Sequence, residues 1–397
     1  MVPLTASRSP LPRSFWLLAA VVLLSRCGAL IQPMLTYWLT GPLGAPLTAA
    51  AWVAAAWGAG STLGSLIGGV TADRFGRRRS LLISGFGASC AVYVLGRASD
   101  AAVAARVAFV VALLTDMGRP AVFAMVADVV PPEDRARAYA WMYVAVNLAF
   151  AVTPAIAGRL AGYGYDVVFA VSVGVLLAYT AVVAVALPET RPAAGPGRAG
   201  VGFGVALGDR VFLAFVGLCV LSTLVAMQGM VPLSAWMKSQ GHGEASYGGV
   251  MALNGALIVV CQPTVTRLVG RRDAARVFAL GAALQGVGFA MHGAGATIGW
   301  HRVALTVWTG GEMLLAPVMS AVVAALAPAE ARGRYQGLMA MSWGVAGGAA
   351  PLLGAEVMTR ASAGALWGGC AVLGVVCALG SLALGPALRR RMASDAG

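Results

Sequence analysis

Twelve long apolar segments dominate this sequence and restrict what it can fold into. Each approaches or exceeds about 20 mostly apolar residues, the length that a helix needs to cross the hydrocarbon core of a bilayer. Backbone polar groups in lipid must be satisfied within the segment, so we expect twelve transmembrane helices in an all-α membrane protein. The segments fall at 14–39, 47–72, 79–96, 101–127, 136–158, 166–187, 211–236, 247–268, 276–293, 298–326, 333–357 and 363–386.

The composition excludes an ordinary soluble protein. Only 11% of the residues are charged and 59% are hydrophobic, whereas soluble domains carry about 25% charged residues. A net charge of +13 would suggest nucleic-acid binding in a soluble chain. In a membrane protein, an excess of Arg on one side of the bilayer explains it instead. We therefore expect the lipid bilayer as a partner and no nucleic acid.

Basic residues gather in alternate loops. Most of the 28 Lys and Arg residues lie in the two tails and in the loops after the even-numbered segments, and Arg26 and Arg119 lie inside segments. Loops rich in Lys and Arg face the cytoplasm. This predicts a multi-pass protein of the cell (inner or plasma) membrane with both termini in the cytoplasm. The opposite side holds Arg97, Arg106, Arg159, Lys238, Arg302 and Arg360.

The two halves of the chain repeat each other at a constant spacing. Residue pairs at this spacing include Pro120 with Pro317, Pro131 with Pro328, Arg135 with Arg332, Arg137 with Arg334, and Pro154 with Pro351. Such a repeat predicts two six-helix bundles around a pseudo-two-fold axis, with a substrate site between them near mid-membrane. We assign residues 1–187 to the N-terminal bundle, 188–210 to a cytoplasmic linker rich in Pro, Gly and Arg, and 211–397 to the C-terminal bundle.

A charged loop, "GGVTADRFGRRRS", separates the second and third segments. It fits the loop signature Gly-x-x-x-Asp-Arg/Lys-x-Gly-Arg/Lys-Arg/Lys of the major facilitator superfamily. With the twelve segments and the repeat, the chain resembles this superfamily over essentially its whole length. The resemblance implies a secondary transporter that works by alternating access. The matching residues are Gly69, Asp73, Arg74, Gly76, Arg77 and Arg78.

Within the superfamily the chain is similar to the drug:proton antiporter branch. The similarity lies in "RPAVFAMVADVVPPEDRARAYA" after the fourth segment and "GRYQGLMAMSW" at the eleventh. The branch signature of the fifth segment survives only as Pro154 and Gly158. The resemblance implies an antiporter for proton-coupled multidrug efflux and antibiotic resistance, or for export of a secondary metabolite. A facilitator or proton symporter that imports a nutrient is the alternative.

Four charged residues lie near the middle of segments, where each costs a few kcal/mol to insert. In this family the first, fourth, seventh and tenth segments line the central cavity, so the resemblance places all four charges there. Asp116 and Arg119 are one helical turn apart and can pair, and Arg26 at similar depth can complete a triad. This group is either a permanent brace or a switching element. The four residues are Arg26, Asp116, Arg119 and Glu312.

Glu312 differs from the other charges because its own helix offers no basic residue at i±3 or i±4. A low dielectric favours the protonated form of such a carboxyl, which suits a proton carrier. A neutral Glu that only bonds a neighbouring helix is the alternative. The proton gradient is then the energy source, and we expect no cofactor and no metal.

Large apolar side chains on the same segments are candidates for the walls of the substrate cavity. Met and aromatic surfaces suit varied amphiphilic ligands. Helix packing or an interfacial aromatic belt is the other interpretation of each of them. The candidates are Met34, Tyr37, Trp38, Met227, Trp236, Trp308 and Met313.

The signature loop also predicts a cytoplasmic gate. Gly60, Gly64 and Gly68 recur every four residues and give the second segment a flat face for close helix contact. By resemblance, Asp73 braces the N-terminus of the eleventh segment, and Arg77 pairs with Asp128. Contact of the loop arginines with anionic headgroups is the simpler alternative.

An enzyme embedded in the membrane is a different class of protein with the same composition. The sequence contains no His-Glu-x-x-His, no nucleophile–His–Asp pattern and no P-loop. His242, His292 and His301 lie near the outer side without ligand spacing. We therefore expect no enzymatic activity.

Overall fold

The computed structural model describes residues 11–131, 134–190, 204–270, 272–328 and 331–394, and every regular element within them is helical. Eleven of the described helical segments are long and apolar enough to cross a membrane. The helix α4 (Arg77–Leu95), which begins with three arginines, occupies the place of the predicted third span. The predicted all-α membrane fold is confirmed.

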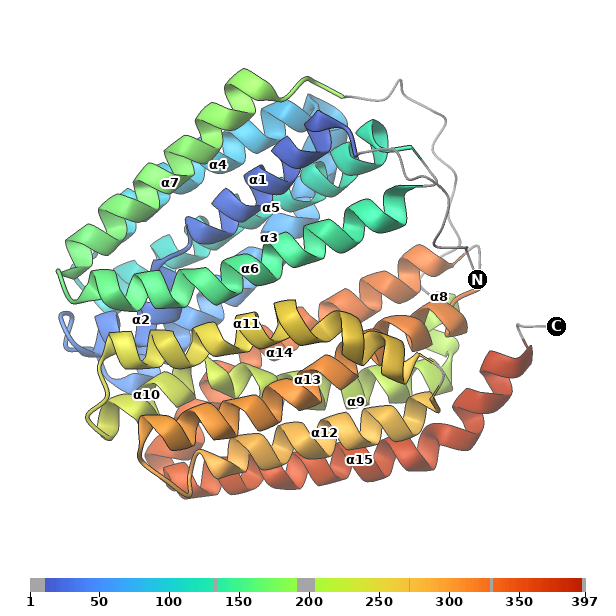
Figure 1. The fold of residues 1–397 in the computed structure, drawn as a ribbon. Helices are drawn as coiled ribbons and strands as arrows, with labels where there is room; N and C mark the ends of the chain where they lie inside the picture. The colour runs from blue at the N-terminus through green and yellow to red at the C-terminus, as the bar shows by residue number, and fades with distance from the viewer. Residues whose placement is uncertain (1–10, 132–133, 191–203, 271, 329–330, 395–397) are drawn as a thin grey trace.

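The N-terminal bundle is drawn from blue to green in Figure 1. Its helices are α1 (Arg13–Cys27), α2 (Ile31–Thr40), α3 (Leu47–Phe75), α4, α5 (Ala101–Val129), α6 (Arg135–Ala161) and α7 (Tyr165–Ala186). α1 and α2 follow one another as the two parts of the first span, and the successive spans alternate in direction along the chain.

The C-terminal bundle is drawn from yellow-green to red. It begins with a short helix that the sequence reading placed in a linker, while residues 191–203 of that linker lie outside the described residues. The elements are α8 (Gly204–Gly208), α9 (Arg210–Ala226), the 3₁₀ turn η2 (Met227–Gly229), α10 (Val231–Ser239), α11 (Glu244–Val269), α12 (Ala274–Met291), α13 (Ile298–Leu326), α14 (Arg332–Arg360) and α15 (Ala363–Ser394).

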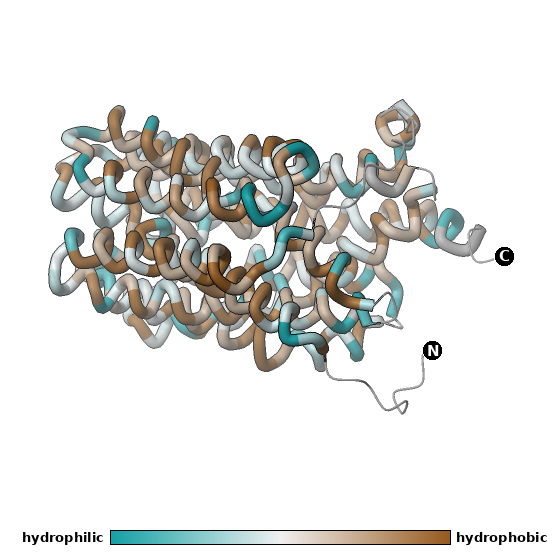
Figure 2. The backbone as a smooth tube through the Cα atoms, turned by 90° about the horizontal axis from the view of Figure 1, so that it is seen from above, coloured by the Kyte–Doolittle hydropathy of each residue, from teal (hydrophilic) through white to brown (hydrophobic). Residues whose placement is uncertain are grey.

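The two ends of the molecule are distinguished by the chain direction. The end where α1 begins and α15 ends is here called the terminal end, and the end where α2 and α10 finish is the distal end (Figure 1). Figure 2 shows apolar coils along most of the length of both bundles between these ends. This apolar belt is what a bilayer-spanning bundle must present to lipid.

Two spans that the sequence predicted as continuous are broken in the middle. The first is interrupted between α1 and α2, and the seventh between α9 and α10. Pro33 lies in the first turn of α2 and Pro232 in the first turn of α10. Because proline has no backbone N–H to donate to the preceding turn, a continuous helix is disrupted there. The breaks occupy equivalent places in the two bundles.

The glycine face of α3 is confirmed. A Cβ atom at Gly60, Gly64 or Gly68 would collide with a backbone carbonyl oxygen of α5. Only glycine therefore permits the observed approach of these two helices. This close pair forms one rigid wall of the N-terminal bundle.

The buried apolar core is continuous at the distal end and divided at the terminal end. One cluster joins residues of both bundles, including Trp38 and Phe169 with Tyr247 and Trp308. At the terminal end, one cluster belongs to the N-terminal bundle and another to the C-terminal bundle. The bundles therefore pack against each other at the distal end and separate toward the terminal end.

Candidate functional site

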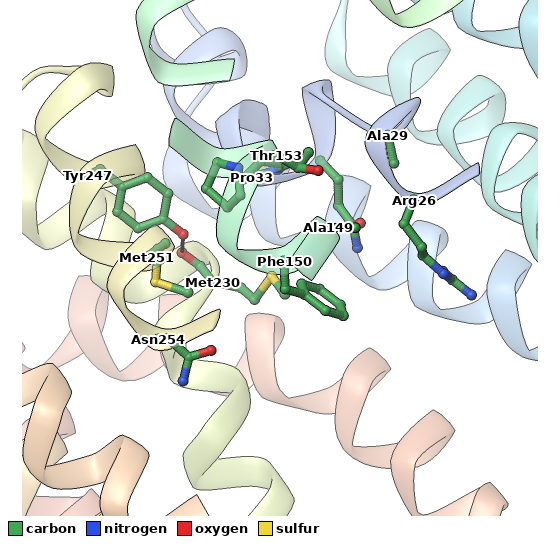
Figure 3. Close-up of a pocket in the computed structure, with 12 residues that line it drawn as sticks. Arg26, Ala29, Pro33, Ala149, Phe150, Thr153, Met230, Tyr247, Met251 and Asn254 are labelled. Atoms are coloured by element: carbon green, nitrogen blue, oxygen red, sulfur yellow. Dashed lines mark hydrogen bonds between the residues drawn. The ribbon is translucent and has the colours of Figure 1, made fainter. Parts of the chain in front are cut away.

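A cavity of about 630 Å³, partly open to solvent, lies between the bundles. The α1–α2 junction and α6 form one side, and α11 with the α9–α10 break forms the other (Figure 3). The helix breaks of both bundles thus border this space. The lining residues are Arg26, Ala29, Gln32, Pro33, Ala149, Phe150, Thr153, Pro154, Met230, Tyr247, Met251 and Asn254.

A charged cluster occupies the N-terminal side of this cavity. Arg26 of α1 donates from Nη2 to Oδ1 of Asp116 on α5 at 2.9 Å. Ser61 of α3 donates its hydroxyl to the other carboxylate oxygen of Asp116. The Asp116 side chain is only 8% exposed, against 26% for Arg26. Each carboxylate oxygen of Asp116 therefore has a hydrogen-bond partner.

Arg119 does not take part in this ion pair. The sequence reading placed it one turn from Asp116 as a partner, but the carboxylate bonds Arg26 and Ser61 instead. Arg119 is solvent-exposed, although it lies near the middle of α5. Its guanidinium is within electrostatic range of both Arg26 and Asp116. Arg119 is therefore an exposed cation close to the Arg26–Asp116 pair.

Glu312 of α13 forms the matching feature of the C-terminal bundle. Its Oε2 accepts a hydrogen bond of 2.9 Å from Nδ2 of Asn254, which also donates to Thr309 Oγ1 at 3.0 Å. Asn254 itself lines the cavity. The phenol of Tyr143 on α6 is the group of the other bundle that lies within electrostatic range of this carboxyl. All these partners are uncharged, so they can serve a neutral or an ionised carboxyl.

None of the seven predicted wall residues is among those that line the cavity. Met34, Tyr37, Trp38 and Trp308 are at most 3% exposed, and Met313 is 8% exposed. Met34, Tyr37, Trp38 and Trp308 pack within the apolar cluster at the distal end, and Met313 is buried. Met227 and Trp236 are half-buried outside the lining, and Trp236 donates to the carbonyl of His292 at 2.8 Å. In this structure these side chains take part in helix packing, the alternative interpretation, and do not form the cavity wall.

The predicted gate loop is partly assembled. Arg77 pairs with Asp128 as predicted. Asp73 and Arg74 are exposed, and Asp73 makes no hydrogen bond to any described residue. Because the bundles separate at the terminal end, Asp73 does not brace α14 in this structure. Gly69 has open space around it.

A residue that the sequence reading missed completes the gate loop. Glu189, which follows α7, accepts hydrogen bonds at Oε1 from the backbone N–H groups of Arg77 at 2.8 Å and Arg78 at 3.4 Å. A carboxylate at this place satisfies unpaired N–H groups and meets the positive end of the α4 dipole. Gly76 has φ of +96°, and a Cβ there would strike the Glu189 carboxylate. This contact explains the glycine of the signature.

Hydrogen bonds join the two bundles at the distal end. Tyr37 donates to the carbonyl of His242 at 2.9 Å, and Tyr165 donates to Glu244 at 2.9 Å. Lys238 donates to Thr40 Oγ1 at 2.7 Å. A Cβ at Gly158 or Gly248 would also strike the backbone of the opposite bundle. The distal end is therefore closed, and the cavity opens toward the terminal end.

Paired bundles that enclose a charged cavity, closed at one end and open at the other, define a membrane transporter. Comparison with known families makes the assignment specific. The family model described as Major Facilitator Superfamily matches residues 15–351. The chain belongs to this superfamily, which confirms the expected family.

Relatives of known sequence are also transporters. A Na(+), Li(+), K(+)/H(+) antiporter of Planococcus maritimus is 26% identical over 310 residues, which cover 69% of this chain and 73% of that protein. An uncharacterized MFS-type transporter of Bacillus subtilis (strain 168), YttB, is 25% identical over 347 residues, covering 83% of this chain and 84% of the relative. Both relatives are described as transporters.

Solved structures support the fold. A peptide transporter POT in complex with sulfate superposes with a TM-score of 0.81 and 18% identity, over 96% of each chain. A bacterial homologue of the human drug peptide transporters PepT1 and PepT2 gives a TM-score of 0.75 and 21% identity, over 96% of this chain and 99% of that one. At these identities the likeness concerns the fold alone.

Proposed function

We propose that this protein is a monomeric, proton-coupled secondary transporter that exports amphiphilic small molecules, including drug-like compounds or a secondary metabolite, by alternating access. Glu312 is the proton-carrying carboxyl. The observation that carries this proposal is the position of Glu312: mid-membrane, beside the cavity, with uncharged hydrogen-bond partners. Protonation of such a carboxyl leaves no unpaired cation in the membrane.

Asp116 has the other role in this proposal. Its contacts with Arg26 and Ser61 join α1, α3 and α5, so in this proposal it positions the first, second and fourth spans rather than carrying the proton. A change of partner from Arg26 to Arg119 during transport is the switching alternative, and the exposed guanidinium of Arg119 is close enough to support it.

The loop arginines support an orientation in which the terminal end faces the cytoplasm of a cell-membrane protein. In that orientation the structure is inward-facing. Asp73 would meet the N-terminus of α14 only after the cavity closes on the cytoplasmic side, which gives the signature loop its role as a gate.

Proteoliposomes with the pH dye pyranine trapped inside test the proposal. A pH gradient is imposed, and compounds of different charge are added one at a time while proton movement and compound uptake are recorded. We expect coupled movement with wild type and none with Glu312→Gln, which should still exchange labelled for unlabelled compound. Gradient-independent equilibration by wild type would instead establish a facilitator.

Monovalent cation/proton antiport is a second candidate, favoured by the relative from Planococcus maritimus. In the same vesicles, additions of NaCl, LiCl and KCl would then release protons, while organic compounds would not. Carboxylate oxygens are the hard ligands such ions prefer, and Asp116 and Glu312 are the mid-membrane carboxylates beside the cavity.

A further inference from the structure

The charges around the cavity are not balanced on the N-terminal side. Two guanidinium groups, Arg26 and Arg119, face one carboxylate, Asp116, whose oxygens are already taken by Arg26 and Ser61. Arg119 makes no hydrogen bond or ion pair with the described residues, yet it is exposed and within electrostatic range of Arg26, which lines the cavity. A bare cation at this depth is costly unless water or an anion reaches it.

Apolar surface lines the same cavity as Arg26, the guanidinium neighbour of Arg119. Phe150, Met230 and Met251 line the cavity near Arg26, and Phe150 is 46% exposed. An apolar body packed on these side chains would leave a polar group free to reach toward α5. Mid-membrane guanidinium groups select carboxylate, sulfonate or phosphate by charge-assisted hydrogen bonds.

We propose that the transported molecule is an anionic amphiphile, whose acidic group binds Arg119 while its apolar part lies against Phe150, Met230 and Met251. This inference rests on the proposed transport function and adds the substrate class. It disfavours both lipophilic cations and alkali-metal ions as cargo, because each would approach an unpaired guanidinium.

Equilibrium binding tests the inference apart from proton coupling. Purified protein in phosphatidylcholine nanodiscs is titrated with 2-naphthoate, with the neutral 2-naphthamide and with the cationic 2-naphthylmethylammonium. We expect wild type to bind the carboxylate about tenfold more tightly than the amide, the size of one charged hydrogen bond. Arg119→Gln should remove this preference while leaving amide binding unchanged.

Arg106→Gln is the matched control, because Arg106 is an exposed arginine at the distal end of the same helix. It should bind all three compounds as wild type does. Equal binding of carboxylate and amide by wild type, or an intact preference in Arg119→Gln, would overturn the inference. If the compounds bind as expected but no pH gradient drives them, the proposed proton coupling fails and the substrate class stands.

The acidic group can belong to a soluble molecule or to an anionic lipid. Nanodiscs with 20% phosphatidylglycerol, a share on the order of that in bacterial membranes, separate the two sources. Competition by this lipid that disappears in Arg119→Gln identifies a lipid headgroup as the bound anion. Unchanged naphthoate affinity identifies a soluble amphiphile.

A second, independent feature lies at the distal end, where all three histidines of the chain converge. His292 and His301 are 0% exposed, and their Nδ1 atoms are 2.9 Å apart. His301 Nε2 lies 2.7 Å from Gln240 Oε1, an acceptor, so this nitrogen carries the proton. His301 Nδ1 then accepts, and His292 Nδ1–H donates. This leaves the buried His292 Nε2 unprotonated and without a partner.

This histidine pair supports the loop that closes the distal end. Gln240 donates to Gly295 at 3.4 Å, and His242 Nε2 lies 2.6 Å from the carbonyl of Ala296. The carbonyl of His242 in turn accepts from Tyr37 of the other bundle. The loop between α10 and α11 is therefore held by the histidines on one side and holds the N-terminal bundle on the other.

We infer that acid on the distal side releases this closure. When both imidazoles are protonated, each Nδ1 is a donor, and their mutual hydrogen bond is lost. The titratable and charged groups that face the region from neighbouring elements do not form that bond; they are Tyr37 on α2, Tyr165 on α7, Lys238 on α10, His242 in the loop before α11, Glu244 on α11 and Arg302 on α13.

The direction of the pH effect follows from the neutral state of the pair. Burial, followed by the proximity of His301, lowers the pKa of His292 to about 3. A histidine with a lowered pKa in the folded state stabilises that state above its ordinary pKa of about 6.5. This contribution declines as pH falls below that value, so the closed distal end weakens in mild acid.

Hydrogen exchange of the peptide that spans 237–247, corrected for intrinsic rates, measures the closure. We expect exchange at least about tenfold faster at pH 5.5 than at pH 7.5, because one proton taken up by His292 alone gives a factor of ten over one pH unit below its ordinary pKa. His292→Asn, whose amide can still donate to His301, and His301→Gln should each reduce the response. Glu244→Gln is the control. A response of unchanged size in both histidine variants, or its loss in Glu244→Gln, would refute the inference.

Discussion

Asp116 and Glu312 occupy nearly equivalent positions in the two repeated bundles but have different hydrogen-bond partners. Glu312 lies one residue from the position that the repeat pairs with Asp116. Asp116 is held by a cation and a hydroxyl, whereas Glu312 is held by the amide of Asn254. An ion pair fixes a charge, but an amide serves either protonation state. In the proposed mechanism, the N-terminal carboxyl therefore supplies structure and the C-terminal one exchanges protons.

The largest expected effect comes from removing the titratable group. Glu312→Gln should reduce pH-gradient-driven transport to the level of protein-free liposomes, because the amide cannot carry a proton. Its unfolding midpoint should stay near that of wild type, since the hydrogen bond with Asn254 can be kept. If the pH gradient still drives transport in this variant, Glu312 does not carry the proton.

Asp116→Asn should act on stability instead. Loss of the carboxylate leaves Arg26 without its partner in a poorly hydrated position, at a cost of about 2–3 kcal/mol. Chemical denaturation in detergent measures this loss. Adding Arg26→Gln should recover part of it, because the pair is then replaced by neutral groups. Additive losses in the double variant would show that the two residues are not coupled.

A third prediction concerns the wall that supports Asp116. Gly64→Ala should destabilise the protein by about 1–3 kcal/mol, because its Cβ would strike the Leu113 carbonyl of α5. Gly69→Ala on the same helix is the control, since nothing lies within 4 Å of the added methyl. At the repeat-related positions of α11 the chain carries Leu257, Cys261 and Val265. Equal tolerance of both alanines would contradict the proposed rigidity of the α3–α5 pair.

The smallest expected effect concerns the N-termini of α12 and α4, which the two bundles cap differently at the terminal end. Asp273 caps α12 by accepting from Arg276 N–H at 2.9 Å, whereas α4 depends on the distant Glu189. A hydrogen bond from Arg389, then the Arg276 N–H, lowers the pKa of Asp273. The Asp273 carboxylate therefore stabilises the folded state at pH values above its ordinary pKa of about 3.9. This contribution is lost as the pH falls below that value.

Asp273→Asn should therefore lower stability by less than about 1 kcal/mol at pH 7, since the site is partly solvated. The difference from wild type should shrink as the pH falls below about 4. Thermal unfolding at pH 7 and at acid pH measures both statements. Glu189→Gln is the comparison variant in the other bundle. A constant difference at both pH values would exclude the carboxylate as the cause.

The candidate site was only partly predictable. The cost of charge in lipid drew attention to Arg26, Asp116, Arg119 and Glu312, and the structure places charged groups from both bundles around the cavity. Spacing along one helix suggested Asp116 and Arg119 as a pair, yet Arg26, ninety residues away in the chain, is the partner. Neutral residues such as Ser61 and Asn254 gave no such signal, because polar side chains of this kind are common within helices.

The apolar wall could not be identified from residue type. Large side chains such as Trp38 and Trp308 pack equally well in a core or around a ligand, and here they are buried. The histidine pair could not be predicted from the sequence for a related reason. His292 and His301 lie on opposite sides of a turn, and their contact depends on how α12 and α13 pack.

The sequence by itself determined the membrane spans, the repeat and the family, because bilayer thickness and the cost of polar groups in lipid act on every segment locally. Only the tertiary structure decided which carboxyl is paired, which end is closed and which apolar residues line the cavity. These properties depend on contacts between helices far apart in the chain. Glycine contacts, helix breaks and a few long-range hydrogen bonds set those contacts.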